Sequence, residues 1–182
     1  MHVDPDQYVL FSCEGTAERF ILHTLIERDE LIVPKERIVR NRTDGGWAVG
    51  RSRTIIDSYL DADYGDRPLR IVRMVDSESD RYRPPRGYEH MAEVTYLRTR
   101  PEIEMLVIIS EGLYGRYTNA SKRLKPSDYC RSVIGYGQVK KWDWLEGYWA
   151  KPGRLEQALA DYARLHRFAR NENRGLLELL DD

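Results

Sequence analysis

The chain has 182 residues, of which 41% are hydrophobic and 32% are charged, and its formal net charge is −1. These values are typical of a soluble globular protein and argue against intrinsic disorder. Because the net charge is close to zero, any binding of nucleic acid must come from local basic clusters. The apolar runs are shorter than the roughly 18 residues of a membrane-spanning helix. The N-terminus lacks the pattern of a signal peptide, so we expect a cytoplasmic protein with no membrane association.

The N-terminal half of the chain alternates strand-like and helix-like patterns. Helical periodicity is found at 17–28 and 47–60, and strand-like runs at 8–13, 37–41, 69–75 and 93–99. An order of strand, helix, strand, helix, strand predicts a parallel sheet with right-handed crossovers. We therefore expect an α/β fold of the Rossmann-like kind, with a mostly parallel central sheet of about four strands flanked by helices.

The apolar run at 103–109 fits either a buried strand or a buried helix. We choose a helix, because Pro101 followed by Glu102 and Glu104 is typical of a helix start. Beyond residue 115 the composition changes to a polar and basic stretch, an aromatic cluster and a last amphipathic helix at 154–170. That helix packs either against the domain or against a second copy of the chain in a homodimer.

These patterns predict two parts of the chain. We expect an α/β core at 1–115 and a helical C-terminal extension at 116–182 that packs on the core.

Two strand-like runs end in carboxylates. Glu14 follows the first run, while Asp76 and Glu78 follow the third, with Asp80 close behind. The carboxyl ends of parallel strands meet at one edge of a sheet, which is where open α/β sheets bind ligands. Converging carboxylates suit a hard cation such as Mg²⁺. The alternative is that Glu14 merely lies at a helix N-terminus and that 76–80 is a solvated acidic turn.

The pairing of Glu14-Gly15 with Asp76-Ser77-Glu78 resembles the Toprim domain of topoisomerases, primases and certain nucleases. The family has Glu-Gly after its first strand and Asp-x-Asp after its third. This chain departs from that pattern at Glu78, where the family has aspartate, and Asp80 is the alternative ligand.

The resemblance is closest to the RloB-like and OLD-nuclease-related proteins of restriction and phage-defence loci, and it covers about residues 7–145. Their first motif, Glu-Gly-x-x-Glu, matches Glu14-Gly15-Thr16-Ala17-Glu18. Their Pro-x-x-Glu at a helix start matches Pro101-Glu102-Ile103-Glu104.

The resemblance implies that Asp76 and Glu78 hold Mg²⁺ or Mn²⁺, and that Glu14 binds the metal or acts as general acid and base. Glu104 is implied as an extra ligand or a structural brace, and Glu18 as a structural or supporting residue behind the ligands. The implied activity is metal-dependent cleavage of DNA or RNA, in phage defence or in a mobile element. The alternative is a non-catalytic Toprim-like subunit that binds a partner ATPase.

Basic residues near these motifs are candidates for binding a nucleic-acid backbone. Arg81 and Arg83 follow the acidic turn, and Lys140 and Lys141 precede the tryptophan cluster. Lys and Arg beside aromatic residues can bind phosphates and stack bases. The same residues are equally consistent with an ordinary solvated surface. We expect the tryptophans to be core residues, and we expect Cys13 to pack as a small buried residue rather than act as a nucleophile.

Overall fold

The computed structural model describes residues 4–75, 81–98, 103–120, 124–165 and 175–180. The chain forms two compact units, of which the first comprises Met1–Arg98 with Asn173–Asp182 and the second comprises Thr99–Glu172. The division thus falls after residue 98 rather than at residue 115, and the last residues of the chain belong to the first unit. None of the helices in the described ranges has the length and apolar character needed to cross a membrane.

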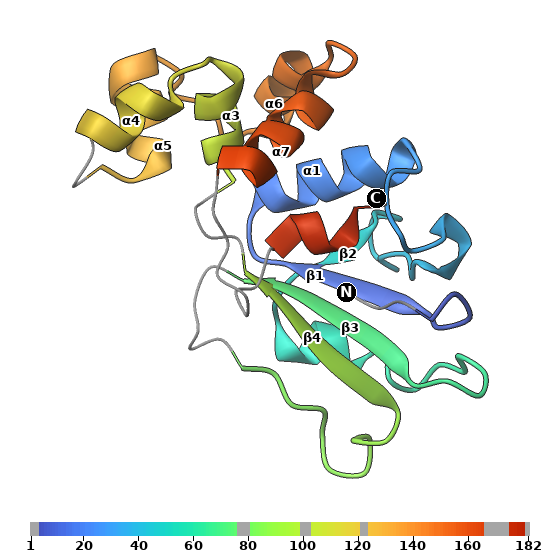
Figure 1. Cartoon of the computed structure of the whole chain (residues 1–182). Coiled ribbons are helices and arrows are strands. Elements are labelled where there is room, and N and C mark those ends of the chain that lie inside the picture. The colour runs from blue at the N-terminus through green and yellow to red at the C-terminus, as the bar shows by residue number, and fades with distance from the viewer. Residues whose placement is uncertain (1–3, 76–80, 99–102, 121–123, 166–174, 181–182) are drawn as a thin grey trace. The chain divides into compact units, whose positions relative to one another are not determined.

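The first unit contains a four-stranded sheet in which all described strand pairs are parallel (Figure 1). Its spatial order is β2-β1-β3-β4. The strands are β1 (Val9–Cys13), β2 (Ala48–Val49), β3 (Leu69–Val75) and β4 (Ala92–Arg98). This arrangement confirms the expected α/β fold with a mostly parallel sheet of four strands and flanking helices.

Helix α1 (Thr16–Glu27) follows β1 directly and ends at Asp29, whose φ of 56° is left-handed. Its apolar residues, including Phe20, Ile21 and Leu25, are buried. The short 3-10 helix η3 (Gly175–Leu179) returns to the same unit, where the Ile32 amide donates to the Leu179 carbonyl at 2.8 Å. In Figure 1, α1 and η3 both lie on the opposite side of the sheet from α2 (Arg53–Asp57).

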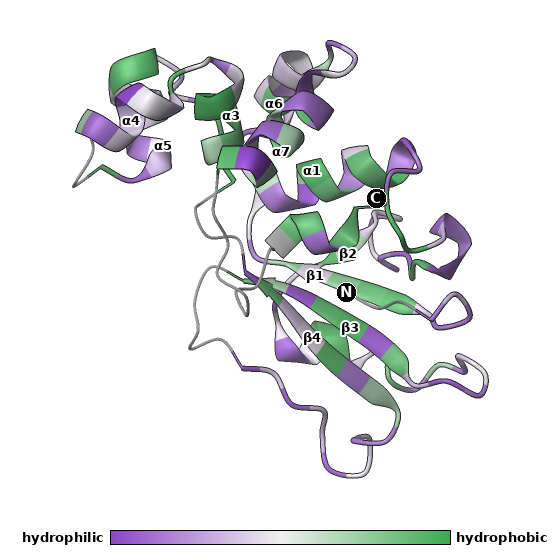
Figure 2. Cartoon of the chain, viewed as in Figure 1, coloured by the Kyte–Doolittle hydropathy of each residue, from purple (hydrophilic) through white to green (hydrophobic). Residues whose placement is uncertain are grey.

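On the α2 side, a core cluster joins all four strands of the sheet to α2 and the turn that follows it. It includes Leu10, Ile71, Ile56 and Tyr59. Figure 2 shows hydrophobic residues along β1 and much of β3. Such burial of apolar surface is the main favourable contribution to folding.

The predicted strand at 37–41 is not a strand in the structure. The 3-10 helix η1 (Lys35–Arg37) includes the first residue of this segment, and a parallel bridge joins Ile38 to Val9. The strand that pairs with β1 on the side away from β3 is β2, which falls inside the segment predicted as the helix at 47–60. Of that predicted helix, α2 is helical and a turn follows it, while residues 48 and 49 pair with β1 instead.

The second unit is helical. α3 (Met105–Ser110) confirms the helix chosen for the ambiguous apolar run, and its first five residues are buried. The last predicted helix is α7 (Arg154–Leu165), which packs against α3. The remaining helices are α4 (Tyr114–Ala120), α5 (Pro126–Tyr129), the π-helix η2 (Cys130–Ile134) and α6 (Trp142–Trp149).

A polar cluster joins α3, α6 and α7 within the second unit. Glu111, at the end of α3, accepts hydrogen bonds from the Tyr148 hydroxyl and from Arg154 Nη2, both at 2.7 Å. Arg154 also lies over the Tyr148 ring, 3.7 Å from its centroid. Burial comes first among the causes that raise the pKa of Tyr148. The carboxylate of Glu111 therefore serves as a structural junction between three helices.

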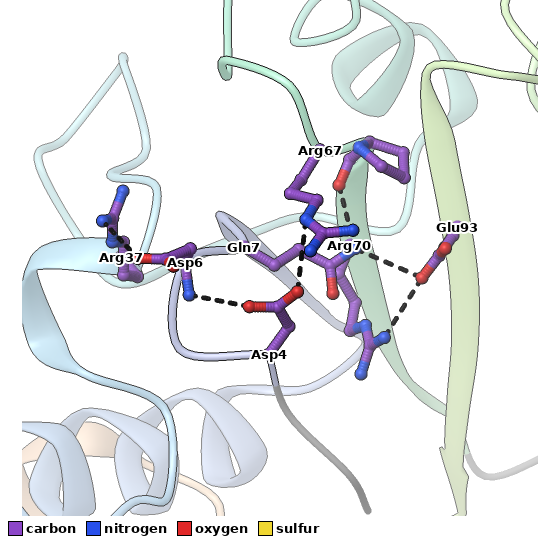
Figure 3. Close-up of polar contacts among 8 residues, drawn as sticks. Asp4, Asp6, Gln7, Arg37, Arg67, Arg70 and Glu93 are labelled. Carbon is purple, nitrogen blue, oxygen red and sulfur yellow. Dashed lines mark hydrogen bonds and ion pairs between the residues drawn. The ribbon is translucent and has the colours of Figure 1, made fainter.

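A second polar network lies at the amino end of the sheet (Figure 3). Gln7 Nε2 donates to the Pro68 carbonyl at 2.9 Å and to Glu93 Oε2 at 3.2 Å. Arg70 pairs with the same Glu93 oxygen at 3.1 Å. The segment before β1 is therefore linked to β3 and β4 at the end of the sheet opposite to the predicted site.

Candidate functional site at the carboxyl edge of the sheet

The strand registers bring three chain segments to the same edge of the sheet. Cys13 of β1 is level with Met74 of β3, and Ser12 is level with Val49 of β2. Glu14 therefore follows β1 at the level where Val75 ends β3. Asp76, the next residue after Val75, and the two later acids Glu78 and Asp80 fall outside the described residues. The structure thus gives the position of Glu14, one of the predicted metal-binding residues.

Glu14 forms an ion pair with Arg51 at this edge. Arg51 Nη1 contacts Glu14 Oε1, and the two side chains are 61% and 28% exposed, respectively. Arg51 lies two residues after β2, in the loop that leads to α2. Sequence reasoning missed Arg51, because its segment was predicted to be helical and its place beside Glu14 depends on the pairing of β2 with β1.

Glu18 bends back toward the start of α1. A Cβ atom built at Gly15 would overlap the Glu18 carboxylate, so the glycine leaves the space that this carboxylate occupies. Gly15 is the N-cap of α1, and Glu18 is the third helical residue, from which glutamate commonly reaches back to the cap. The position of the second glutamate in the Glu-Gly-x-x-Glu motif is therefore explained by its contact with the start of α1.

The backbone after β2 is held by side chains from two neighbouring strands. Ser12 Oγ donates to the Gly50 carbonyl, and Arg73 Nη2 donates to the Arg51 carbonyl, each at 3.3 Å. Arg19 Nη2 lies 3.3 Å from the point that a Cβ at Gly50 would occupy. The absence of a side chain at Gly50 therefore allows the Arg19 guanidinium to approach this loop closely.

Arg73 is a buried charged residue in the central strand β3, with a side chain only 3% exposed. Its guanidinium lies over the Tyr82 ring at 5.5 Å, and the Tyr82 hydroxyl donates to Asp57 at 2.7 Å. Burial and this hydrogen bond raise the pKa of Tyr82. The sequence signal for Arg73 is an arginine among the apolar residues of a strand-like run.

Cys13 is fully buried, and its sulfur lies 3.5 Å from the sulfur of Met74. Burial, and to a lesser extent the charge of Glu18, raise the pKa of this thiol. The prediction that Cys13 packs as a small buried residue is confirmed.

The other predicted residues are distributed over both units. Arg81 and Arg83 are exposed in the segment between β3 and β4 of the first unit, on either side of the buried Tyr82. Glu104 belongs to the second unit, where its 4% exposed carboxylate pairs with Lys140 Nζ at 3.1 Å. Lys141 is exposed next to Lys140. Glu104 is therefore a buried carboxylate that pairs with Lys140 within the second unit.

The tryptophans expected in the core differ in their burial. Trp149 is buried, whereas Trp142 and Trp144 are half-buried. Trp144 stacks on Tyr148 with ring centroids 4.7 Å apart, and this contact is internal to the second unit.

The oxygen donors at the sheet edge suit a hard cation, which favours carboxylates. Within the described ranges, the His, Cys, Asp and Glu side chains form no group of three or more that could hold a metal ion. A magnesium site at this edge with more than one carboxylate from the strand ends would need an acid from residues 76–80, which lie outside the described ranges, in addition to Glu14. One or two carboxylates together with waters are enough for Mg²⁺ in proteins.

Comparison with known proteins found no match to the chain among protein-family models, curated proteins or solved structures. The resemblance to Toprim domains rests on the motifs quoted above.

Proposed function

We propose that the protein is a Mg²⁺-dependent phosphodiester-cleaving enzyme of the Toprim type that acts on nucleic acid. The observation that supports this proposal is the register of β1 and β3, whose ends lie within one residue of each other at the same edge of a parallel sheet. Glu14 and Asp76 directly follow these two strand ends in the sequence. The phage-defence or mobile-element setting rests on the resemblance of the motifs.

In this proposal, Glu14, Asp76 and Glu78 hold the metal ion. A bound Mg²⁺ supplies a Lewis acid that polarises a phosphoryl oxygen. Glu14 is partly exposed, so it is also accessible as the acceptor of a proton from an attacking water. None of the tyrosines is assigned as a nucleophile, so water is the attacking group.

The charge of the described residues around Glu14 supports a phosphate-containing substrate. Arg51 is in contact with Glu14, and Arg19 lies beside Gly50 in the same region. Arginine binds phosphate oxygens with charge-assisted hydrogen bonds. Positive side chains at a strand edge that carries carboxylates are what a metal-assisted phosphoryl-transfer site needs.

The test is cleavage of labelled DNA and RNA by the purified chain, with Mg²⁺ or Mn²⁺ and with a chelator. We expect metal-dependent cleavage that falls at least about a hundredfold in Asp76→Asn and in Glu14→Gln. Each substitution removes the negative charge of a carboxylate that binds the metal ion in this proposal. Glu36→Gln is the matched control, since this exposed carboxylate of η1 lies near the amino end of β1. Cleavage that is equally strong in Asp76→Asn would exclude the proposed site.

The ion pair between Glu14 and Arg51 favours a second candidate function. A carboxylate neutralised by arginine can serve the fold alone, and the chain would then be a non-catalytic subunit that binds a partner ATPase. This candidate predicts a protein that binds no Mn²⁺, cleaves neither DNA nor RNA, and copurifies with an ATPase. Metal binding that depends on Asp76 would count against it.

A further inference from the structure

Four positive side chains of the segment 35–42 lie over aromatic rings of the first unit. The pairs are Lys35 and Arg40 over Trp47, Arg37 over Tyr8, and Arg42 over Tyr59. The electron-rich face of an aromatic ring attracts a cation, and the planar guanidinium of arginine stacks on it while its N–H groups remain able to bind other partners. The segment therefore carries a row of positive charges at defined positions.

Two of these four cations pair with carboxylates and two do not. Lys35 and Arg37 each pair with a carboxylate, at 2.9 and 3.2 Å, and Figure 3 shows the pair of Arg37. Arg40 and Arg42 are exposed, and they form no ion pair with any other residue in the part of the chain that the structure describes. Asp44, the acid next to them in the sequence, accepts a hydrogen bond from the backbone amide two residues further on. The charges of these two arginines are thus available to a partner outside the chain.

The backbone that carries the two arginines is held in place. Asn41 lies buried between them, and its amide donates to the Gly46 carbonyl at 2.8 Å. The Arg42 amide donates to the Tyr59 hydroxyl, also at 2.8 Å. Each guanidinium donates from Nη1 to a backbone carbonyl, at 3.0 Å for Arg40 and at 2.9 Å for Arg42. Because a guanidinium has five N–H donors, both arginines keep donors for a further acceptor.

We propose that Arg40 and Arg42 together bind the phosphodiester backbone of a nucleic acid. This inference rests on the proposed function for the class of the partner, and it uses neither Glu14 nor a metal ion. Guanidinium groups bind phosphate oxygens through charge-assisted hydrogen bonds. The rings beneath the two arginines are only 4% (Trp47) and 2% (Tyr59) exposed, so they are not accessible for stacking on bases. The contact is therefore with the backbone, and its strength does not depend on base sequence.

The first unit offers a matched control in two arginines that pair with carboxylates. Arg53 and Arg67 are 63% and 61% exposed, and each forms an ion pair with an aspartate. Glutamine at both of these positions changes the net charge of the protein by the same amount as glutamine at Arg40 and Arg42. The two double variants therefore differ in whether the lost positive charge had a carboxylate partner.

The measurement is fluorescence anisotropy with a labelled single-stranded DNA and with an RNA of the same sequence, in the presence of a chelator. We expect Arg40→Gln combined with Arg42→Gln to bind about tenfold more weakly than wild type at low salt, because two charge-assisted contacts are lost. The slope of log affinity against log salt concentration should become shallower by roughly 1.4, since each phosphate contact to a single strand contributes roughly 0.7. A loss confined to the DNA or to the RNA shows which of the two is bound.

The control variant and a competitor decide between this contact and a general effect of charge. Arg53→Gln combined with Arg67→Gln should bind within about twofold of wild type, because exposed paired charges contribute little. An equal loss of affinity in both double variants would overturn the inference. Polyglutamate that displaces the nucleic acid at an equal concentration of charge would overturn it too, because the site would then suit an acidic protein equally well.

Circular dichroism checks that each variant is folded. If the double variant at Arg40 and Arg42 does not fold, the two single variants replace it, each with an expected loss of about threefold. Unchanged affinity in both single variants would then overturn the inference.

The chelator separates this inference from the proposed function. Wild type that binds neither strand overturns the role of Arg40 and Arg42, while the cleavage assay with Mg²⁺ or Mn²⁺ decides the proposed activity independently. Binding that depends on these two arginines in a protein that cleaves neither DNA nor RNA supports the contact and overturns the proposed activity.

Discussion

At the scale of single residues, the Glu14 motif combines two different tasks. Glu14 is partly exposed and contacts a basic side chain, as a ligand-binding residue does. Glu18, four residues later, bends back over Gly15 at the start of α1. The first glutamate therefore pairs with the loop after β2 and the second reaches back over the helix start, although both belong to one short sequence pattern.

Gly15 and Glu18 should be energetically coupled. The Gly15 backbone, with φ −111° and ψ 169°, accepts any residue, so the cost of Gly15→Ala comes from displacing the Glu18 carboxylate. Glu18→Ala alone should lower the free energy of unfolding by about 0.3–1 kcal/mol, the usual value of an acid in the first helical turn. In the Gly15→Ala background the same change should cost less. Urea denaturation of the four proteins in this double-mutant cycle measures the coupling; strictly additive costs would contradict the contact.

The two cysteines should be unreactive in the native protein. Cys13 and Cys130 are both buried, and burial raises the pKa of the Cys13 thiol. A thiol with a raised pKa stays protonated at pH 8 and is a poor nucleophile. We therefore expect no rapid reaction with a disulfide reagent at pH 8 in buffer and reaction of both thiols in denaturant. Fast labelling of Cys13 in the folded protein would show that the end of β1 opens readily.

At the scale of the elements, strongly periodic segments were predicted well. The apolar residues of β1, α1 and β3 carry their own local pattern, and so the edge where Glu14 lies could be predicted from sequence. β2 has two residues, too few for a pattern, and it exists because Phe11 and Ser12 of β1 pair with it. Arg51 follows β2, so its contact with Glu14 depends on a long-range pairing that local periodicity cannot reveal.

The network at the amino end of the sheet predicts how stability depends on pH. A hydrogen bond from Gln7 is the main cause that lowers the pKa of Glu93 in the folded protein, and Arg70 adds to it. A carboxyl with a lowered folded pKa contributes stability above its unfolded pKa of about 4.3, and this contribution is lost as the pH falls through the folded value.

Glu93→Gln should therefore destabilise the protein at pH 7 by less than about 1 kcal/mol, because the partly exposed pair is screened by solvent. The difference from wild type should shrink as the pH falls below about 4. Urea midpoints measured between pH 3 and 7 test this. A difference that stays constant over that range would mean that the charge of Glu93 does not matter and that the side chain acts only by packing.

At the scale of the whole molecule, the chain returns to its first unit after completing the second. An antiparallel bridge joins Leu31 to Leu180, and Leu179 is fully buried. The sequence does not predict this pairing, because the two residues are far apart in the chain. The short apolar run at the C-terminus has no local pattern that indicates which segment it packs against. The boundary expected at residue 115 followed a change in composition, whereas the observed division follows the packing of α3 against α7.

The two units should differ in how they respond to core substitutions. Leu179 in the first unit and Leu155 in the second are both fully buried, which makes them a matched pair. Truncation of either to alanine should cost about 2–5 kcal/mol, the usual range for a buried leucine. Leu179→Ala should accelerate hydrogen exchange in β1 and β3, and Leu155→Ala should do so in α3 and α7. If each variant accelerates exchange in both sets of segments equally, the two units unfold as a single cooperative structure, and the C-terminal return then stabilises the whole chain rather than the sheet that carries Glu14.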